Sequence, residues 1–421
     1  MDHTIHENNI LNVLKQCFET AVPAKDARTA VTHLAFVVNL VFCFLGDSKT
    51  FSLETVRRSM ISHLNQSISR SAFWDRLSGN RLRRSLHDLI TELMAKFSAL
   101  HQVNETILKK LGVTAIELVD SSSITLLAKA KHDFPGTRTK ASIKWHASVD
   151  LLSGLLAWFQ LTPGRRHDRT CFPDVASLTG KLVIFDLGYW DYSLLYSIEN
   201  IGGFFLSRVK SNAVIRIQEV VQGLSKKAVG QSLFALKLRR KKDDIIEVII
   251  EKIHENNRLR YRVIGFWNPI EKQYHWYITN LTAAAYLMYP LYRLRWQIEL
   301  IFKACKNSLN ANAIPSANKT IIENLLLASI AAHLSTHTII RIGTGVLTQE
   351  RKWAITFQRV AKVAVVLGRD FLVFLLHSSQ ENFNNLANKI KLFANEIFDP
   401  NYKKRETSLG RLNRLLLEVQ A

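Results

Sequence analysis

The spacing of hydrophobic residues divides the chain into a helical start, a strand-rich middle and a helical end. In the first 110 residues, apolar side chains recur at helical spacing, for example at Leu82, Leu86, Leu89 and Leu93. The longest apolar run, Leu34 to Leu45, is too short to span a bilayer and predicts a buried helix. Ser52 and Ser69 are expected to cap two further helices in this region.

From about residue 115 the apolar pattern becomes typical of strands. Five segments are expected to be strands: 116–120, 143–151, 155–162, 182–186 and 204–209. Ser153 and Gly154 join the second and third strands as a hairpin, and a helix is predicted over Tyr192 to Asn200. Antiparallel strands followed by α/β units are the order of an RNase H-like core, so the predicted fold class is α/β (α+β).

A β-rich insertion is predicted over about 212–282, with LFALKLRR, IIEVIIEKI, LRYRVIGFW and YHWYITNL as strands and RRKKDD as a turn. One long amphipathic helix is then expected from near Ala283 to about Leu309, and mostly helices beyond 317. The predicted domains are a helical region 1–112, a core domain 113–335 that holds the insertion, and a C-terminal helical region 336–421 with dimerisation as one role.

Charge favours a polyanionic partner. The 421 residues include 56 Lys and Arg against 35 Asp and Glu, giving a net charge of +21 and a pI near 9.9. Such an excess is expected of a protein that binds nucleic acid, with an anionic membrane as the second reading. Arg83 and Arg84 lie among short helices near a Gly79-Asn80 turn, which suits a helix-turn-helix-like DNA-binding bundle; a solvated basic face is the alternative.

The cysteines suggest neither a zinc site nor a disulfide framework. Cys17, Cys43, Cys171 and Cys305 are far apart and form no C-x-x-C pair, which fits a reducing cytoplasm. The N-terminal segment MDHTIHENN is polar and acidic, unlike a signal peptide. We therefore expect a cytoplasmic protein.

Two aspartates close predicted buried strands. Asp120 follows IELV and Asp186 follows LVIF, and these strands are neighbours in the predicted order. A carboxylate in such a place is costly unless it is paired or coordinated. One such Asp commonly caps a turn, whereas two suggest a shared site whose oxygen ligands suit Mg²⁺ or Mn²⁺.

The segment YRLRWQIELIFKACKN adds a third carboxylate on a mostly apolar predicted helix. At about 100° per residue, Tyr292, Arg295, Glu299 and Lys306 share a stripe about 60° wide. The stripe is either an exposed polar face or a carboxylate surrounded by groups that grip phosphate.

These blocks together resemble a known family. The spacing Y-x2-R-x3-E-x6-K is similar to the signature of the DDE insertion-sequence transposases of the IS-four family. VDSSSI around the first Asp, IKWH, DLGYWD around the second Asp, and YITNL before the signature helix resemble the family's other blocks in order. The resemblance covers roughly residues 115 to 335.

The resemblance implies roles for particular residues. Asp120, Asp186 and Glu299 would be the catalytic acids and hold two divalent ions, Mg²⁺ or in its place Mn²⁺. The expected DNA contacts in this region are Tyr292, Arg295, Lys306, Lys144, His146, Arg208 and Lys210, beside Arg83 and Arg84 of the helical first 110 residues. His146 is equally well read as a structural histidine. Trp267 and Trp276 either stack on an unpaired base or, more simply, pack in the core.

The implied activity is metal-dependent cleavage and transfer of DNA strands at the terminal inverted repeats of an insertion sequence. The partners would be double-stranded DNA, both transposon ends and target, bound by a dimer on paired ends, with no membrane. Three alternatives stay open: an inactive or domesticated DNA-binding relative, an RNase H-like nuclease that cuts without joining, and a peripheral membrane protein.

Overall fold

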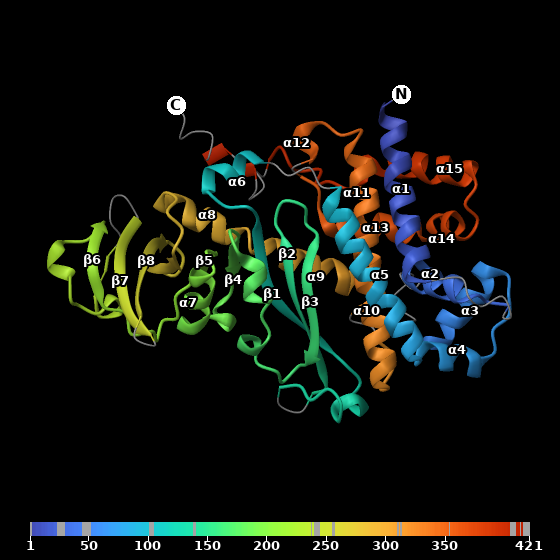
Figure 1. Cartoon of the computed structure of the whole chain (residues 1–421), viewed down its shortest axis with the longest axis horizontal. Helices are drawn as coiled ribbons and strands as arrows, with labels where there is room; N and C mark the ends of the chain where they lie inside the picture. The colour runs from blue at the N-terminus through green and yellow to red at the C-terminus, as the bar shows by residue number, and fades with distance from the viewer. Residues whose placement is uncertain are drawn as a thin grey trace.

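The computed structural model of the chain is built on one large sheet with helices gathered mainly at one end (Figure 1). It describes residues 2–22, 30–43, 52–100, 105–137, 140–236, 238–239, 245–254, 257–309, 311, 314–352, 354–404, 410–412 and 414–415. Within these residues, nine strands form a single sheet in the order β3-β2-β1-β4-β5-β9-β8-β7-β6.

The first five strands form the predicted core. They are β1 (Ile116–Thr125), β2 (Ser142–Asp150), β3 (Leu156–Pro163), β4 (Leu182–Phe185) and β5 (Phe204–Arg208). β2 pairs antiparallel with both β1 and β3, whereas β4 is parallel to β1 and to β5, with α7 (Tyr192–Asn200) between β4 and β5. The RNase H-like order predicted from the sequence is confirmed, with β1 longer than expected.

The insertion continues this sheet. Its strands are β6 (Ile217–Gln222), β7 (Ile245–His254), β8 (Asn257–Asn268) and β9 (Gln273–Thr279), and β9 joins the core by pairing antiparallel with β5. The expectation of a strand at LFALKLRR was wrong, because Leu233–Ala235 forms a 3₁₀ turn there, and the edge strand β6 takes its place. The predicted turn RRKKDD lies mostly outside the described residues, since 240–244 are not among them.

Helices precede the core, as predicted. They are α1 (Asp2–Ala21), α2 (His33–Cys43), α3 (Leu53–Leu64), α4 (Arg70–Leu77), α5 (Asn80–Ala99) and α6 (Glu105–Leu111). The two predicted caps are confirmed: the Ser52 hydroxyl accepts from the Thr55 amide at 3.1 Å, and the Ser69 hydroxyl accepts from the Ala72 amide at 3.2 Å.

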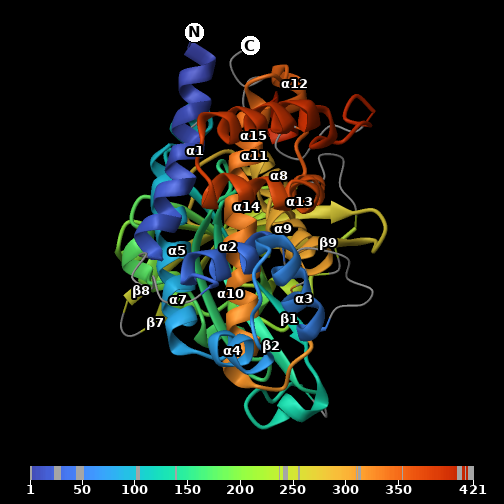
Figure 2. The same ribbon diagram turned by 90° about the vertical axis from the view of Figure 1, so that its right-hand side faces the viewer.

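The helices after the core pack with these N-terminal helices around α10 (Lys319–Ser335). The others are α11 (His337–Thr344), α12 (Gln349–Lys352), α13 (Phe357–Val366), α14 (Gly368–Leu376) and α15 (Gln380–Leu392). α10 contacts α5 and α2, and Figure 2 shows it running through the middle of the helical part. The stretch Lys319–Thr344 is long and apolar enough to cross a membrane, but 89% of its most apolar window is buried inside the structure.

The predicted long helix after the insertion is two helices. α8 (Met288–Arg293) and α9 (Trp296–Ser308) meet at Leu294 and Arg295, where the amides of Leu294, Arg295 and Gln297 bond the carbonyl three residues back. Such bonds tighten the turn and interrupt the α-helical pattern. The expectation of one continuous helix was therefore wrong, because Tyr292 stands on α8 and Glu299 on α9.

Candidate active site

Strand alternation places the two aspartates on one face of the sheet. Leu118 and Ile184 face the core that α9 and α10 cover, and Asp120 and Asp186 each lie two residues further along. Val119 pairs with Phe185 in the parallel β1–β4 ladder, so the two carboxylates leave the sheet side by side. Both therefore point toward the junction of α8 and α9.

That junction brings the third carboxylate to the same place. The Arg295 guanidinium donates to Asp120 Oδ2 at 2.6 Å and to Glu299 Oε1, one helical turn along α9, also at 2.6 Å. The Tyr292 hydroxyl donates to Asp186 Oδ1 at 3.1 Å. The predicted convergence of Asp120, Asp186 and Glu299 is thus seen as three carboxylates arranged around one arginine and one tyrosine.

Electrostatics at this cluster are dominated by burial. Removal from water raises the pKa of the Asp120 carboxyl to about 6; Arg295 and the Ser121 amide oppose this, and the charges of Asp186 and Glu299 add to it. Burial also works against a charged Arg295, but its acidic neighbours, Asp120 first, raise the guanidinium pKa overall. A dense negative charge is therefore balanced by one buried cation.

The donor set fits a divalent ion, provided that Arg295 moves. Over the part of the chain that the structure describes, no group of three or more His, Cys, Asp or Glu side chains is arranged as a ready metal site. At this cluster the Arg295 guanidinium is hydrogen-bonded to two of the acids, Asp120 and Glu299. All three acids offer carboxylate oxygens, the ligands that Mg²⁺ and Mn²⁺ prefer, and the burial of Asp120 favours a strongly charged partner.

Lys306 also reaches strand β1, which carries Asp120. Its Nζ donates to the Ser123 carbonyl of β1 at 2.7 Å, and burial lowers the pKa of its ammonium. Ser123 lies three residues along β1 from Asp120. The role of Lys306 as a phosphate contact stays a prediction.

Lys144 and His146 lie on the opposite face of the sheet. His146 is fully buried, and its ring nitrogens contact the Tyr189 hydroxyl at 3.2 Å and the Thr162 hydroxyl at 3.0 Å. Burial lowers the pKa of this imidazole to about 4, so it is neutral. Of the two readings that the sequence allowed, this arrangement is that of a structural histidine. It gives no support to a DNA contact.

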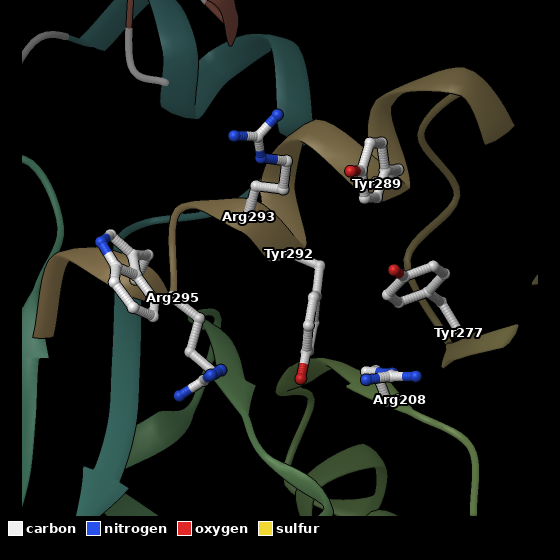
Figure 3. A pocket seen from close by; sticks show the side chains of 7 residues that line it. Arg208, Tyr277, Tyr289, Tyr292, Arg293 and Arg295 are labelled. Carbon is white, nitrogen blue, oxygen red and sulfur yellow. The ribbon is translucent and has the colours of Figure 1, made fainter. Parts of the chain in front are cut away.

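Beside the acids lies a cavity of about 300 Å³ lined by arginines and aromatic rings. Its lining residues are Arg208, Tyr277, Tyr289, Tyr292, Arg293, Arg295 and Trp296. Figure 3 shows the Tyr292 hydroxyl and the Arg295 guanidinium directed the same way, with Arg208 near Tyr277. Sequence analysis identified Arg208 but not Arg293 or the half-exposed Trp296, although these follow directly after the signature residues Tyr292 and Arg295.

The other residues predicted to contact DNA, Lys210, Arg83 and Arg84, differ in how far they interact with other groups of the protein. Lys210 donates to the Trp190 carbonyl at 3.3 Å and lies over the Trp190 ring. Arg83 pairs with Glu323 of α10 at 2.7 Å while its side chain stays 42% exposed, and Arg84 is exposed. These positions leave Arg84 the more accessible of the two arginines for a DNA backbone.

The two tryptophans of the insertion both pack near Tyr274. Trp276 is 6% exposed and lies near Tyr274, and Trp267 packs edge-on against the same Tyr274 ring with centroids 5.2 Å apart. Gly265 faces Trp276 across the β8–β9 ladder, where an added Cβ would approach the indole to 2.6 Å. Packing is the role that this arrangement favours.

Sequence analysis did not identify one acidic residue near the site, Asp168. Asp168 begins a short 3₁₀ turn, η3 (Asp168–Thr170), and accepts hydrogen bonds from Ser121, next to Asp120, and from Lys144. It sits in the segment GRRHDR, which has no helical or strand period, so no pattern marked it.

Comparison with known proteins matches the region that carries this site. A family profile described as "Transposase DDE domain" matches residues 114–335. The transposase for insertion sequence element IS231F from Bacillus thuringiensis subsp. israelensis is 24% identical over 65% of this chain and 65% of that protein. The transposase for insertion sequence element IS1151 from Clostridium perfringens is 24% identical over 70% of this chain and 72% of that protein.

A solved structure is more loosely similar. The piggyBac transposase synaptic complex with hairpin DNA aligns over 91% of this chain and 82% of that chain, with 10% identity and a TM-score of 0.43.

Proposed function

Because the chain belongs to the family of transposases with a DDE domain, we propose that it cleaves DNA at the ends of an insertion sequence and transfers those ends to target DNA. The resemblance inferred from its sequence blocks is confirmed by the family match and by relatives named as insertion-sequence transposases. The observation that carries the proposal is the arrangement of Asp120, Asp186 and Glu299 around Arg295 within the matched region.

The DDE domain implies dependence on divalent metal ions. We infer that Asp120, Asp186 and Glu299 hold two Mg²⁺ ions, which Mn²⁺ can replace. When bound, the ions would activate water or a DNA 3′-OH and stabilise the leaving oxygen of an in-line displacement. Support comes from the all-oxygen donor set and from the burial that raises the pKa of Asp120 to about 6.

The protein's own groups then position the reacting phosphate. Arg295 leaves Asp120 and Glu299 and can clamp a phosphate with two parallel hydrogen bonds. Tyr292 continues to donate to Asp186 and so fixes the orientation of that carboxylate. Lys306, tied to β1 through Ser123, supplies a second cation close to the acids. Positioning and charge stabilisation are most of what a protein contributes to phosphoryl transfer.

Double-stranded DNA is the partner that this chemistry and charge require. A net charge of +21 provides sequence-independent attraction to phosphates, and we assign recognition of the transposon ends to the helices of residues 1–112. Two copies acting on paired ends would bring two active sites to one complex, and the C-terminal helices are the region we assign to dimerisation. Since the relatives named above are bacterial, we place its action on prokaryotic nucleoid DNA.

The test is a cleavage assay on the DNA that flanks this gene. Purified protein, Mg²⁺ and a fragment carrying both flanks should give breaks at two inverted repeats, followed by joined products. Asp186→Asn should abolish cleavage while binding of the fragment persists, because the substitution keeps the size of the side chain but removes a metal ligand. Full cleavage by Asp186→Asn would refute the assignment of the acids. Binding without cleavage by the wild type would favour the inactive DNA-binding relative.

A further inference from the structure

Asp168 links segments that carry both catalytic aspartates, although it lies on the other face of the sheet. Its Oδ1 accepts from the Ser121 hydroxyl at 2.9 Å and from Lys144 Nζ at 2.8 Å. Ser121 and Lys144 belong to paired strands β1 and β2, on the face opposite to Asp120. One carboxylate oxygen therefore ties β1 to β2 directly behind the first catalytic acid.

Ser121 transmits this tie to Asp120. The Ser121 amide donates to Asp120 Oδ1 at 2.8 Å, and that bond helps to stabilise the ionised carboxylate. Because the Ser121 hydroxyl is held by Asp168, rotation of the Ser121 backbone is opposed at the residue whose N–H aims at Asp120. Asp168 thus acts on the orientation of the catalytic carboxylate without touching it.

The same carboxylate also supports the loop that follows Asp186. Gly188, two residues after Asp186, packs so closely on Asp168 that an added Cβ would lie 3.1 Å from Oδ2. The next residue, Tyr189, is buried and contacts His146 on β2. The D-x-G-Y loop therefore packs against Asp168, and a side chain at residue 188 would have to displace that carboxylate slightly.

The charge of Asp168 is partly shielded from water and is paired. Its side chain is 27% exposed and that of Lys144 is 13% exposed. Lys144 Nζ also donates to the Arg166 carbonyl at 2.9 Å and so fastens the loop that carries Arg165 and Arg166, both exposed. A pair so placed has specific geometry, unlike a solvent-exposed surface ion pair.

We propose that Asp168 is a positioning residue of the active site. Through Ser121 it sets the carboxylate of Asp120, and through Gly188 it sets the loop from Asp186, so that the two acids keep the mutual orientation needed to bind metal ions. The inference rests on the proposed function of Asp120 and Asp186 as metal ligands. Groups that orient metal ligands typically change metal affinity or activity by about 10–100-fold when they are removed.

Two variants test this role, with one matched control. Asp168→Asn keeps the shape and one acceptor but removes the charge that pairs with Lys144, and Ser121→Ala removes only the hydroxyl link. Asp150→Asn is the control, because Asp150 also accepts local hydrogen bonds, from Ser153, but lies six residues along β2 from Lys144. Circular dichroism and thermal unfolding show which variants are folded, and Ser121→Ala decides the question if Asp168→Asn is not.

The first readout needs neither metal nor cleavage. Hydrogen exchange in the DNA-free protein should rise in both peptides that carry a catalytic aspartate, 117–123 and 184–190, in Asp168→Asn, and in 117–123 in Ser121→Ala. Asp150→Asn should leave both peptides as in the wild type. Exchange that rises only in the 164–170 loop would overturn the proposal, because Asp168 would then order its own loop and nothing beyond it.

The second readout is the Mn²⁺ concentration that gives half-maximal cleavage at saturating DNA, together with Mn²⁺ binding followed by electron paramagnetic resonance. Both midpoints should rise about 10-fold or more in Asp168→Asn and stay unchanged in Asp150→Asn. Midpoints within two-fold of the wild type in both Asp168→Asn and Ser121→Ala would overturn the inference. A wild type that binds Mn²⁺ but never cleaves would refute the proposed function, whereas hydrogen exchange and Mn²⁺ binding would still decide the role of Asp168.

Discussion

Replacing Arg295 by glutamine should destabilise the metal-free protein and free the acids for a cation. Arg295 is the buried counter-ion of Asp120 and Glu299, with 2.6 Å contacts to each and side chains that are 15%, 15% and 30% exposed. Removing one member of a buried pair typically costs about 3–5 kcal/mol, because a charge is left uncompensated. Here protonation of Asp120 sets an upper limit to the loss in the free energy of unfolding.

That limit follows from the pKa of Asp120. Burial holds this pKa at about 6 even with Arg295 in place, so removal of the guanidinium raises it further and favours the protonated carboxyl. We therefore expect Arg295→Gln to lower the free energy of unfolding by roughly 1–3 kcal/mol at pH 8. At pH 5.5 the loss should be smaller, because Asp120 is then largely protonated in the wild type too.

The assay is urea unfolding at both pH values, with and without Mg²⁺. Mg²⁺ should stabilise Arg295→Gln more than the wild type, because the ion no longer competes with the guanidinium for Asp120 and Glu299. Arg293→Gln is the stability control, since Arg293 is exposed on α8 and lies over the Tyr289 ring at 5.8 Å. In single-turnover cleavage at saturating DNA, Arg295→Gln should be slower by about 100-fold, the scale for losing a group that stabilises transition-state charge.

Two results would refute this reasoning. Unfolding free energies that match the wild type at pH 8 would mean that Arg295 is not the counter-ion of the acids. A change in DNA affinity alone, with the saturated cleavage rate unaltered, would make Arg295 part of a general DNA-binding surface.

Three further outcomes are expected. Glu299→Gln should retain binding to transposon-end DNA in a gel-shift assay but lose Mg²⁺-dependent cleavage, and cleavage at the wild-type rate would remove Glu299 from the metal site. Arg84→Ala should weaken DNA affinity and lower the magnitude of the slope of log K against log salt by about 1, with the saturated cleavage rate unchanged. Arg83→Ala should in addition destabilise the fold by roughly 1–3 kcal/mol, because Glu323 is left nearly buried without its partner. Equal unfolding midpoints for the two variants would contradict this expectation. Burial lowers the pKa of His333 and of His146 to about 4 each, so both are neutral in the fold and protonate more readily when unfolded. Burial raises the pKa of Asp120 to about 6, and this group offsets one of the two histidines between about pH 6 and 4. Stability should therefore fall as the pH drops from about 6.5 toward 4, by up to about 1.4 kcal/mol per pH unit in net, and urea midpoints that do not change over this range would count against it.

The sequence predicted that Asp120 and Asp186 lie on one face of the sheet, because strand periodicity is local. Asp120 and Asp186 each end an apolar run, and alternation within each strand decides which face the side chain takes. Their proximity then required only the strand order, which the succession of hairpin and helix indicated. The caps at Ser52 and Ser69 were predictable for the same reason, since a hydroxyl and an amide three residues apart settle them.

Features that depend on long-range contacts were not predictable. The join of the insertion to the core through β5 and β9 involves residues about 70 positions apart, and no local pattern encodes it. β6 was missed because it is an edge strand with mostly exposed polar residues, while the apolar LFALKLRR resembles a strand but turns at Leu233. The break at Leu294 leaves no mark in composition, and Asp168 lies in an aperiodic basic loop.

The most direct test of the account is a crystal structure of the protein with transposon-end DNA and Mn²⁺, with the ions located by anomalous scattering. We expect Mn²⁺ bound among the carboxylates of Asp120, Asp186 and Glu299, and the Arg295 guanidinium moved from the acids to a DNA phosphate. Mn²⁺ bound elsewhere, with Arg295 still bridging Asp120 and Glu299 beside the DNA end, would contradict the assignment of these three acids as the catalytic site.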